Sequence, residues 1–193
     1  MKISTWNVNS VNARIEHLEK FIKKDQSDIY LLQELKTIED GFPKEIIKNA
    51  GYYSYVNGQK AWNGVAILSK EKLEITNTSI PTYDDPNARF IETEIQLKKI
   101  KKNIKLINIY LPNGNPIETE KFDYKIKWMK KFNSYIQGLK NKNIPIIISG
   151  DFNVIPTDDD VYSPENFKND ACTHPLTREQ YRILINMGFT DLV

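Results

Sequence analysis

Asp151 and Asn153 are the residues whose types and spacing most clearly suit chemistry. They follow the apolar run at residues 144–148, after which come Ser149 and the break at Gly150. A short, continuous apolar run is typical of a strand buried on both faces. If the backbone stays extended, side chains two residues apart point the same way, and a carboxylate beside an amide can bind a divalent cation and a phosphate. The alternative is that both residues only shape a turn, as Asp and Asn often do.

Three other predicted strands also lead to a polar side chain. They cover residues 2–6, 28–34 and 105–111 and supply Asn7, Glu34 and Tyr110, respectively. Asn7 has an alternative reading as a turn residue or helix cap, whereas an unpaired buried glutamate is costly and needs a partner or a cation. In α/β sheets, ligands gather outside the carboxyl ends of the strands. If these strands are neighbours that run the same way, their ends form one pocket.

Such a pocket would contain two carboxylates, two amides and a phenol. The set includes no cysteine or histidine, which argues against zinc. Oxygen donors with room for water favour Mg²⁺ or Mn²⁺, and an anionic phosphodiester would complete the coordination. The candidate metal ligands are Asn7, Glu34, Asp151 and Asn153.

The elements that must position these residues alternate between helices and strands. Helical periodicity is predicted from Ser10 through residue 22, over residues 118–139, and in a last helix that stops at Gly188. Further strands are predicted at residues 52–56, 65–69, 73–80, 90–97 and, as a beginning, 189–193. The helix at 118–139 carries lysines opposite its apolar stripe and follows Asn113, so Lys121 and Lys125 are candidates for phosphate contact. The alternative is a solvated lysine face.

Length and composition limit the class of protein. The chain has 193 residues, which suits one domain. Its 27 Lys and Arg against 25 Asp and Glu exclude bulk basicity, so DNA affinity requires a local patch. The single cysteine, Cys172, excludes an intrachain disulfide and fits a reducing interior. No signal peptide or membrane-length apolar segment is evident, so a cytoplasmic protein without a membrane partner is expected.

Six short motifs resemble one family in sequence order. They are T-W-N-V-N-S, L-L-Q-E, W-N-G-V-A-I-L-S, Y-L-P-N-G-N-P, T-E-K-F-D-Y-K-I-K-W-M and S-G-D-F-N-V. Together they resemble the exodeoxyribonuclease III family of bacterial apurinic/apyrimidinic endonucleases, within the endonuclease/exonuclease/phosphatase superfamily. The resemblance implies an α/β fold, a four-layered sandwich with two central mixed β-sheets flanked by helices. It also implies Mg²⁺-dependent cleavage of double-stranded DNA at abasic sites and 3′ ends.

The resemblance also implies roles for individual residues. Glu34 would be a metal ligand, Asn7 and Asn153 would orient metal-bound water and phosphate, and Tyr110 would lie against the scissile phosphate. Asp151 would handle a proton, either from the attacking water or to the leaving oxygen. The residues expected to contact DNA are Arg89, Asn113, Lys121 and Lys125.

The sequence departs from the family at its C-terminal end. The family continues to a Ser-Asp-His motif that these residues lack, so residues 1–193 are expected to be a single, C-terminally truncated domain, about three quarters of the family's length. The fragment is expected to be weakly active or inactive and able to self-associate, whereas the full-length form would be a monomer. The alternatives are a sibling phosphoesterase that acts on a lipid or inositol phosphate, and a non-catalytic fragment that binds DNA or a partner.

Overall fold

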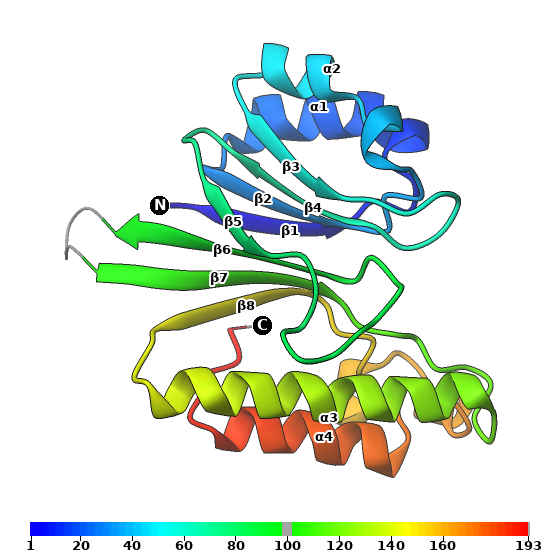
Figure 1. Ribbon diagram of the computed structural model, residues 1–193. Coiled ribbons are helices and arrows are strands. Elements are labelled where there is room, and N and C mark those ends of the chain that lie inside the picture. The colour runs from blue at the N-terminus through cyan, green and yellow to red at the C-terminus, as the bar shows by residue number, and fades with distance from the viewer. Residues whose placement is uncertain (98–101, 193) are drawn as a thin grey trace. The chain divides into compact units, whose positions relative to one another are not determined.

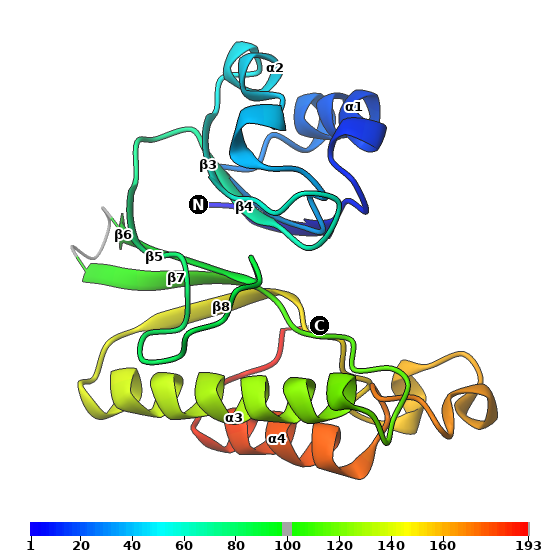
Figure 2. The ribbon, with the colours of Figure 1, turned by 45° about the vertical axis from the view of Figure 1, so that its right-hand side comes forward.

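The computed structural model describes residues 1–97 and 102–192 and divides into two compact units. The first unit comprises Met1–Tyr110 and Pro145–Asp151, and the second comprises Leu111–Ile144 and Phe152–Val193. Figure 1 and Figure 2 show the elements of both units along the chain.

The first sheet of the first unit has the strand order β1-β2-β4-β3. Its strands are β1 (Ile3–Asn7), β2 (Ile29–Gln33), β3 (Tyr53–Asn57) and β4 (Val65–Ser69). β1 pairs with β2 in parallel, whereas β4 is antiparallel to both β2 and β3, so the sheet is mixed. All residues of β2 and β4 are buried, as expected of apolar strands in the middle of a sheet.

Two helices cover the outer face of this sheet (Figure 1). They are α1 (Ile15–Asp25) and α2 (Lys44–Asn49), each preceded by a 3₁₀ turn, η1 (Asn12–Arg14) and η2 (Glu39–Gly41). The helices are amphipathic, and their buried side chains Leu18, Ile22 and Ile47 join the core formed with alternate residues of the strands. The sequence expectation of a helix after β1 is therefore confirmed, with its first turn in the 3₁₀ conformation.

The second sheet has the order β5-β6-β7-β8. Its strands are β5 (Glu74–Asn77), β6 (Phe90–Leu97), β7 (Lys102–Tyr110) and β8 (Ile146–Asp151). β5, β6 and β7 are antiparallel, and β8 runs parallel to β7. Leu31 and Ile67 of the first sheet pack against Ile91 and Leu106 of the second. The two mixed sheets thus lie face to face around an apolar core.

The second unit is helical. It contains α3 (Glu120–Asn141), η3 (Asp158–Asp160), η4 (Pro164–Phe167) and α4 (Pro175–Asn186). α3 packs against α4, and a buried hydrogen bond from Asn133 Nδ2 to Gln180 O, at 3.0 Å, joins the two helices. None of the helices that the structure describes combines the length and apolar content that a membrane crossing requires.

The expected strand after α4 is not present at residues 189–192. The Phe189 N–H instead donates to Ile185 O at 3.1 Å, and the Lys140 ammonium lies 5.3 Å from the centroid of the Phe189 ring. These contacts hold the segment against the helices of its own unit. Val193 lies outside the described residues.

Candidate active site

Asn7 and Asp151 meet at the carboxyl ends of β1 and β8. Asn7 Nδ2 donates a hydrogen bond to Asp151 Oδ2 at 2.7 Å. Asn7 Oδ1 accepts one from the Asn9 backbone N–H at 3.0 Å. Because both ends of the Asn7 amide are engaged, the amide has one orientation. The contact holds the Asp151 carboxylate and joins the end of the first sheet to the end of the second.

Glu34 and Tyr110 form a second pair on the adjacent strands. The Tyr110 hydroxyl donates a hydrogen bond to Glu34 Oε1. Tyr110 lies opposite Asp151 in the parallel β7–β8 pairing, and Asn7 lies opposite Gln33 in β1–β2. The structure therefore brings four predicted residues together at neighbouring strand ends. Their catalytic roles stay predictions.

The Tyr110 side chain is a neutral hydrogen-bond donor. Burial raises the pKa of its hydroxyl, and the hydrogen bond to the Glu34 carboxylate raises it further. The Arg89 guanidinium has the opposite but smaller effect on this pKa. The hydroxyl therefore keeps its proton at neutral pH and supports the negative charge of Glu34.

Arg89 lies beside Tyr110, immediately before β6. Its guanidinium carbon is 4.8 Å from the centroid of the Tyr110 ring, and Arg89 Nη1 donates to Tyr110 O at 3.1 Å. A guanidinium stacked on a ring is attracted by the electrons of the ring face. Arg89 thus places a positive charge next to Tyr110 at the end of β7.

The backbone leaves β2 in an unusual conformation at Glu34. Its φ of 56° lies in the left-handed region, as does the φ of 46° at Asn153. Such conformations cost about 1–3 kcal/mol in residues other than glycine and concentrate at functional sites. At Glu34 the turn is held from both sides, because Glu34 O accepts from the Ser10 N–H at 2.8 Å and the Leu35 N–H donates to Gly64 O at 3.2 Å.

Lys36 is a nearby residue that sequence reasoning missed. Its ammonium lies 3.5 Å from Glu34 Oε2 and donates to Asn9 Oδ1 at 2.5 Å. Its φ of 54° places it in the same left-handed turn as Glu34. The sequence offers no local signal for this contact, because the return of Lys36 towards Glu34 depends on that turn. Lys36 links the loops that follow β1 and β2.

Asn113 and Asn153 form a hydrogen-bonded pair in the second unit. Asn113 Nδ2 donates to Asn153 Oδ1 at 3.2 Å, and Asn153 Nδ2 donates to Leu111 O at 2.8 Å. The Asn153 amide is therefore fixed in direction. The structure thus brings together two residues that were predicted separately, one as a DNA contact and one as a metal ligand.

Lys125 does not occupy the solvent-facing position that was expected. It is 0% exposed, and its ammonium donates to Asn113 O at 2.9 Å and Asn153 O at 2.6 Å. Its stem also fits closely against Gly114, where an added Cβ would lie 2.6 Å from Lys125 Cδ. A direct phosphate contact requires an accessible ammonium, so the structure contradicts this role for Lys125.

Lys121 differs from Lys125 in its surroundings. It is exposed in the first turn of α3. An exposed lysine near a helix N-terminus can reach a phosphate, and DNA contact by Lys121 stays a prediction.

The donor set of the first unit fits a hard divalent cation. The carboxylates of Glu34 and Asp151 and the amide of Asn7 offer only oxygen ligands or hydrogen bonds to bound water. The described residues contain no group of three or more His, Cys, Asp or Glu that could hold a metal ion. Mg²⁺ does not need such a group, since one or two carboxylates, water and a substrate phosphate usually complete its shell. The chemistry of the site therefore suits Mg²⁺ or Mn²⁺ rather than zinc.

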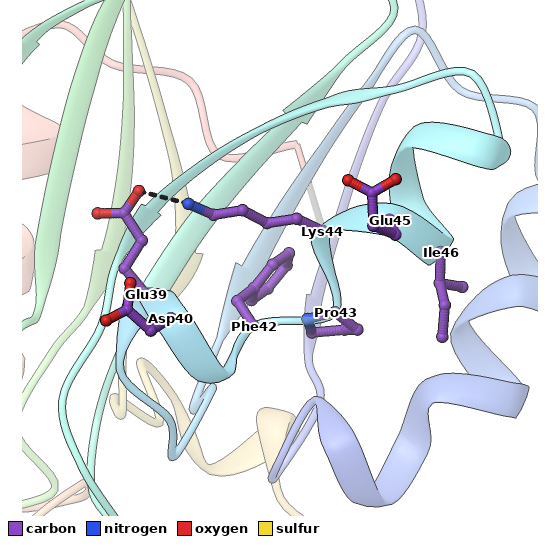
Figure 3. A pocket seen from close by; sticks show the side chains of 7 residues that line it. All are labelled: Glu39, Asp40, Phe42, Pro43, Lys44, Glu45 and Ile46. Atoms are coloured by element: carbon purple, nitrogen blue, oxygen red, sulfur yellow. Dashed lines mark hydrogen bonds and ion pairs between the residues drawn. The ribbon is translucent and has the colours of Figure 1, made fainter.

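A surface pocket near η2 and α2 is separate from these residues. Figure 3 shows its lining: Glu39, Asp40, Phe42, Pro43, Lys44, Glu45 and Ile46. Lys44 Nζ donates to Glu39 Oε1 across it at 2.7 Å. The pocket includes none of the predicted site residues.

Comparisons with known proteins agree with this geometry. Residues 4–190 match the model of the Endonuclease/Exonuclease/phosphatase family. Exodeoxyribonuclease III of Haemophilus influenzae is 35% identical, over 99% of this chain and 74% of its own length. The exodeoxyribonuclease of Bacillus subtilis is 30% identical, over 99% of this chain and 73% of its own.

Solved structures extend the likeness to the fold. An AP endonuclease from Archaeoglobus fulgidus matches with a TM-score of 0.90 and 33% identity, over 99% of this chain and 72% of its own. A 3′-5′ exonuclease from Neisseria meningitidis matches with a TM-score of 0.90 and 32% identity, over 99% and 73%. The predicted fold class and the resemblance to exodeoxyribonuclease III are confirmed. The chain belongs to the endonuclease/exonuclease/phosphatase family.

Proposed function

We propose that this protein is a metal-dependent nuclease of DNA repair that hydrolyses DNA phosphodiesters. Its activities are those of a 3′-5′ exodeoxyribonuclease, an apurinic/apyrimidinic endonuclease and a 3′-end-cleaning enzyme. The observation that carries the proposal is the pair of contacts Asn7–Asp151 and Tyr110–Glu34 at adjoining strand ends. The names of relatives support DNA as the substrate, and one similar structure, a 3′ phosphatase from Neisseria, was solved with a product DNA hairpin.

Glu34 and Asp151 hold Mg²⁺ or Mn²⁺ in this proposal, together with the amide of Asn7. Asn153 follows Asp151 by two residues and adds a second amide. When bound, the ion supplies positive charge that offsets the negative charge developing on the phosphate. The hydrogen bonds already made by these side chains reduce the reorganisation that ion binding requires.

Asp151 handles a proton during in-line attack of water on phosphorus. The new bond joins the water oxygen to phosphorus, and the bond from phosphorus to the leaving oxygen breaks. One proton leaves the attacking water and one reaches the leaving oxygen, and the Asp151 carboxylate takes part in one of these transfers. Asn7 supports this role by holding Asp151 Oδ2 at 2.7 Å.

Tyr110 lies against the scissile phosphate and Arg89 lies near the DNA in this proposal, while Asn7 and Asn153 orient the water and the phosphate. The Tyr110 hydroxyl keeps its proton and holds Glu34, while the Arg89 guanidinium, stacked on the same ring, adds positive charge. Positive charge and fixed donors stabilise a reacting phosphate without reorganisation. Asn113 and Lys121 are proposed to contact the DNA backbone outside this centre.

Residues 1–193 are proposed to form one domain of this family and to turn over slowly by themselves. They contain no Ser-Asp-His sequence, and the resemblance assigns that motif a histidine that acts on the phosphate. A cytoplasmic location stays a prediction.

The test is cleavage of a fluorescent duplex that carries one abasic-site analogue, with protein in excess over DNA to detect a slow single turnover. The reaction is run with Mg²⁺ and with EDTA. Asp151→Asn removes the proposed proton carrier and Glu34→Gln removes a proposed metal ligand. Asp159→Asn is the matched control, because Asp159 is an exposed carboxylate outside the site. The expected result is cleavage that requires Mg²⁺, that is lost in Asp151→Asn and Glu34→Gln, and that is retained in Asp159→Asn.

Other outcomes favour the alternatives. DNA binding without product, unchanged in Asp151→Asn, would support a non-catalytic binding role. Hydrolysis of a phosphoinositide or sphingomyelin in place of DNA would support a sibling phosphoesterase. Cleavage at the rate of a complete family member would contradict the proposed slow turnover.

A further inference from the structure

Gln33 and Asn108 form a buried amide pair between the two sheets of the first unit. Gln33 is 1% exposed and Asn108 is 0% exposed. Gln33 Nε2 donates to Asn108 Oδ1 at 2.7 Å, which links β2 directly to β7. Buried polar groups are destabilising unless they find partners, so two amides in an apolar core require an explanation.

The other contacts of the pair give it one arrangement. Asn108 Nδ2 donates to Leu32 O at 3.0 Å and to Ala66 O at 2.9 Å in the first sheet. Gln33 Nε2 also has Thr5 Oγ1 at 3.0 Å and Leu31 O at 2.9 Å within hydrogen-bond distance, and its two hydrogens are shared among these oxygens and Asn108 Oδ1. Turning over the Asn108 amide would set its nitrogen against Gln33 Nε2 and its oxygen against two carbonyls. The pair therefore specifies one registration of β7 against the first sheet.

Both residues of the pair lie close in sequence to residues of the candidate active site. Gln33 immediately precedes Glu34 in the sequence. Asn108 precedes Tyr110 by two residues on β7, so their side chains point to the same face of the second sheet. Asn108 meets Gln33 on that face, and Tyr110 meets Glu34. The first contact joins β2 to β7, and the second joins Tyr110, the last residue of β7, to Glu34, the first residue after β2.

The surrounding core cannot set this registration by itself. Leu31, Ile67 and Leu106 pack between the sheets, and apolar contact is non-directional. A small slide of one sheet over the other would retain most of that burial. It would separate the Glu34 carboxylate from the Tyr110 hydroxyl, because a hydrogen bond tolerates little change in distance or angle.

We propose that Gln33 and Asn108 are positioning residues that hold Glu34 against Tyr110 in the geometry that a divalent cation requires. The cation rests on the proposed function, whereas the Glu34–Tyr110 contact does not. Neither residue touches the reacting atoms in this proposal. They act by fixing β2 against β7 beneath the site.

The test uses Gln33→Met, which keeps the length and unbranched shape of the side chain but removes the amide. Ile67→Val is the control, because Ile67 is 0% exposed in the same core between the sheets and makes no contact with the pair through polar atoms. Two properties are measured: the ¹³C resonance of the Tyr110 ring carbon that bears oxygen, assigned with Tyr110→Phe, and Mn²⁺ affinity by electron paramagnetic resonance. Thermal unfolding establishes that each variant is folded.

Gln33→Met is expected to move the Tyr110 resonance and to weaken Mn²⁺ binding about tenfold, as loss of a residue that supports metal ligands usually does. Ile67→Val should leave both unchanged. A folded Gln33→Met with the resonance and affinity of the parent would overturn the proposal. If Gln33→Met does not fold, Asn108→Asp decides by the same two measurements, since it keeps the shape but loses the donors to the first sheet.

Loss of folding in both variants would count against a positioning role, because the pair would then be a requirement of the fold itself. Absence of Mn²⁺ binding in the parent would refute the metal site of the proposed function. The Tyr110 resonance would still test the positioning role in that case, because the contact with Glu34 involves no metal.

Discussion

Replacing Gly150 with alanine should separate β8 from β7 at the residue before Asp151. Gly150 has a φ of +138°, which L residues rarely adopt, and it lies opposite Ile109 in the parallel pairing. A Cβ at this position would lie 2.0 Å from Ile109 O and 2.8 Å from Ile109 N, against the 3.4–4 Å of ordinary contact. Both are backbone atoms, so no change of rotamer can relieve the overlap.

The expected destabilisation is large. The backbone conformation alone costs an alanine about 1–3 kcal/mol. Separating the strands to relieve the overlap also removes ladder hydrogen bonds, each worth about 1 kcal/mol net. If about two ladder hydrogen bonds are lost, the sum is about 3–5 kcal/mol, which is a large part of the 5–15 kcal/mol or so that stabilises an ordinary domain. Asp151 would lose its hydrogen bond from Asn7 as the strand end moves.

Urea unfolding followed by circular dichroism measures this effect as a change in midpoint at constant slope. Gly138→Ala is the matched control, because Gly138 lies within α3 and an added Cβ there meets nothing within 4 Å. That variant should gain about 0.5–1 kcal/mol, since alanine is the better helix former. If Gly150→Ala has the same urea midpoint as the parent protein, β8 does not approach β7 closely at Gly150.

Three further predictions concern charged and buried groups. Glu34→Gln should lower the pKa of Tyr110, although burial should keep it above its ordinary value of about 10; a ¹³C-tyrosine titration with an unchanged Tyr110 curve would contradict this. Burial raises the pKa of Asp170, but hydrogen bonds outweigh it and hold that pKa below its ordinary value. Its contribution to stability is therefore present above about pH 4 and lost as the pH falls further, so Asp170→Asn should flatten the acid limb of the unfolding free energy. Lys125→Met should destabilise the second unit by about 2 kcal/mol, because two carbonyls lose their donor while a buried charge is removed. As a control, Lys121→Met replaces an exposed lysine and should change the free energy of unfolding by less than about 0.5 kcal/mol. Equal effects of the two substitutions in urea unfolding would argue against the role of the Lys125 ammonium.

The strand ends of the site could be predicted because their signal is local. An apolar run followed by a polar residue marks the end of a strand, as at Asp151, the last residue of β8. β8 is only partly buried along its length, whereas the run predicted a strand buried on both faces, because β8 lies at the edge of its sheet. The pairing of β7 with β8 in parallel then follows from the helix that connects them. The contact between Asn7 and Asp151 was predicted only on the condition that their strands are neighbours that run the same way. The sequence does not show how the two sheets pack against each other.

The burial of Lys125 had a signal in the sequence that its charge obscured. Lys125 lies three residues after Phe122 and four before Met129, so helical periodicity places it on the apolar stripe of α3. The prediction placed Lys125 in solvent because of its charge, although its spacing places it on the apolar stripe. The contact of Gln33 with Asn108 had no such signal, since it depends on two strands far apart in the chain packing at one registration.

The Asn7–Asp151 hydrogen bond joins residues 144 positions apart, and this separation has a consequence for how the protein folds. β1 to β7 all precede residue 111, whereas β8 arrives only after the segment Leu111–Ile144. Contacts that close long loops form slowly, because chain entropy opposes them until late. A nascent chain that has emerged only to Tyr110 can pair β1 with β2, but it has no carboxylate for Asn7 to hold. We expect β8 to dock last in the first unit, so that completing the second sheet and delivering Asp151 are one kinetic event.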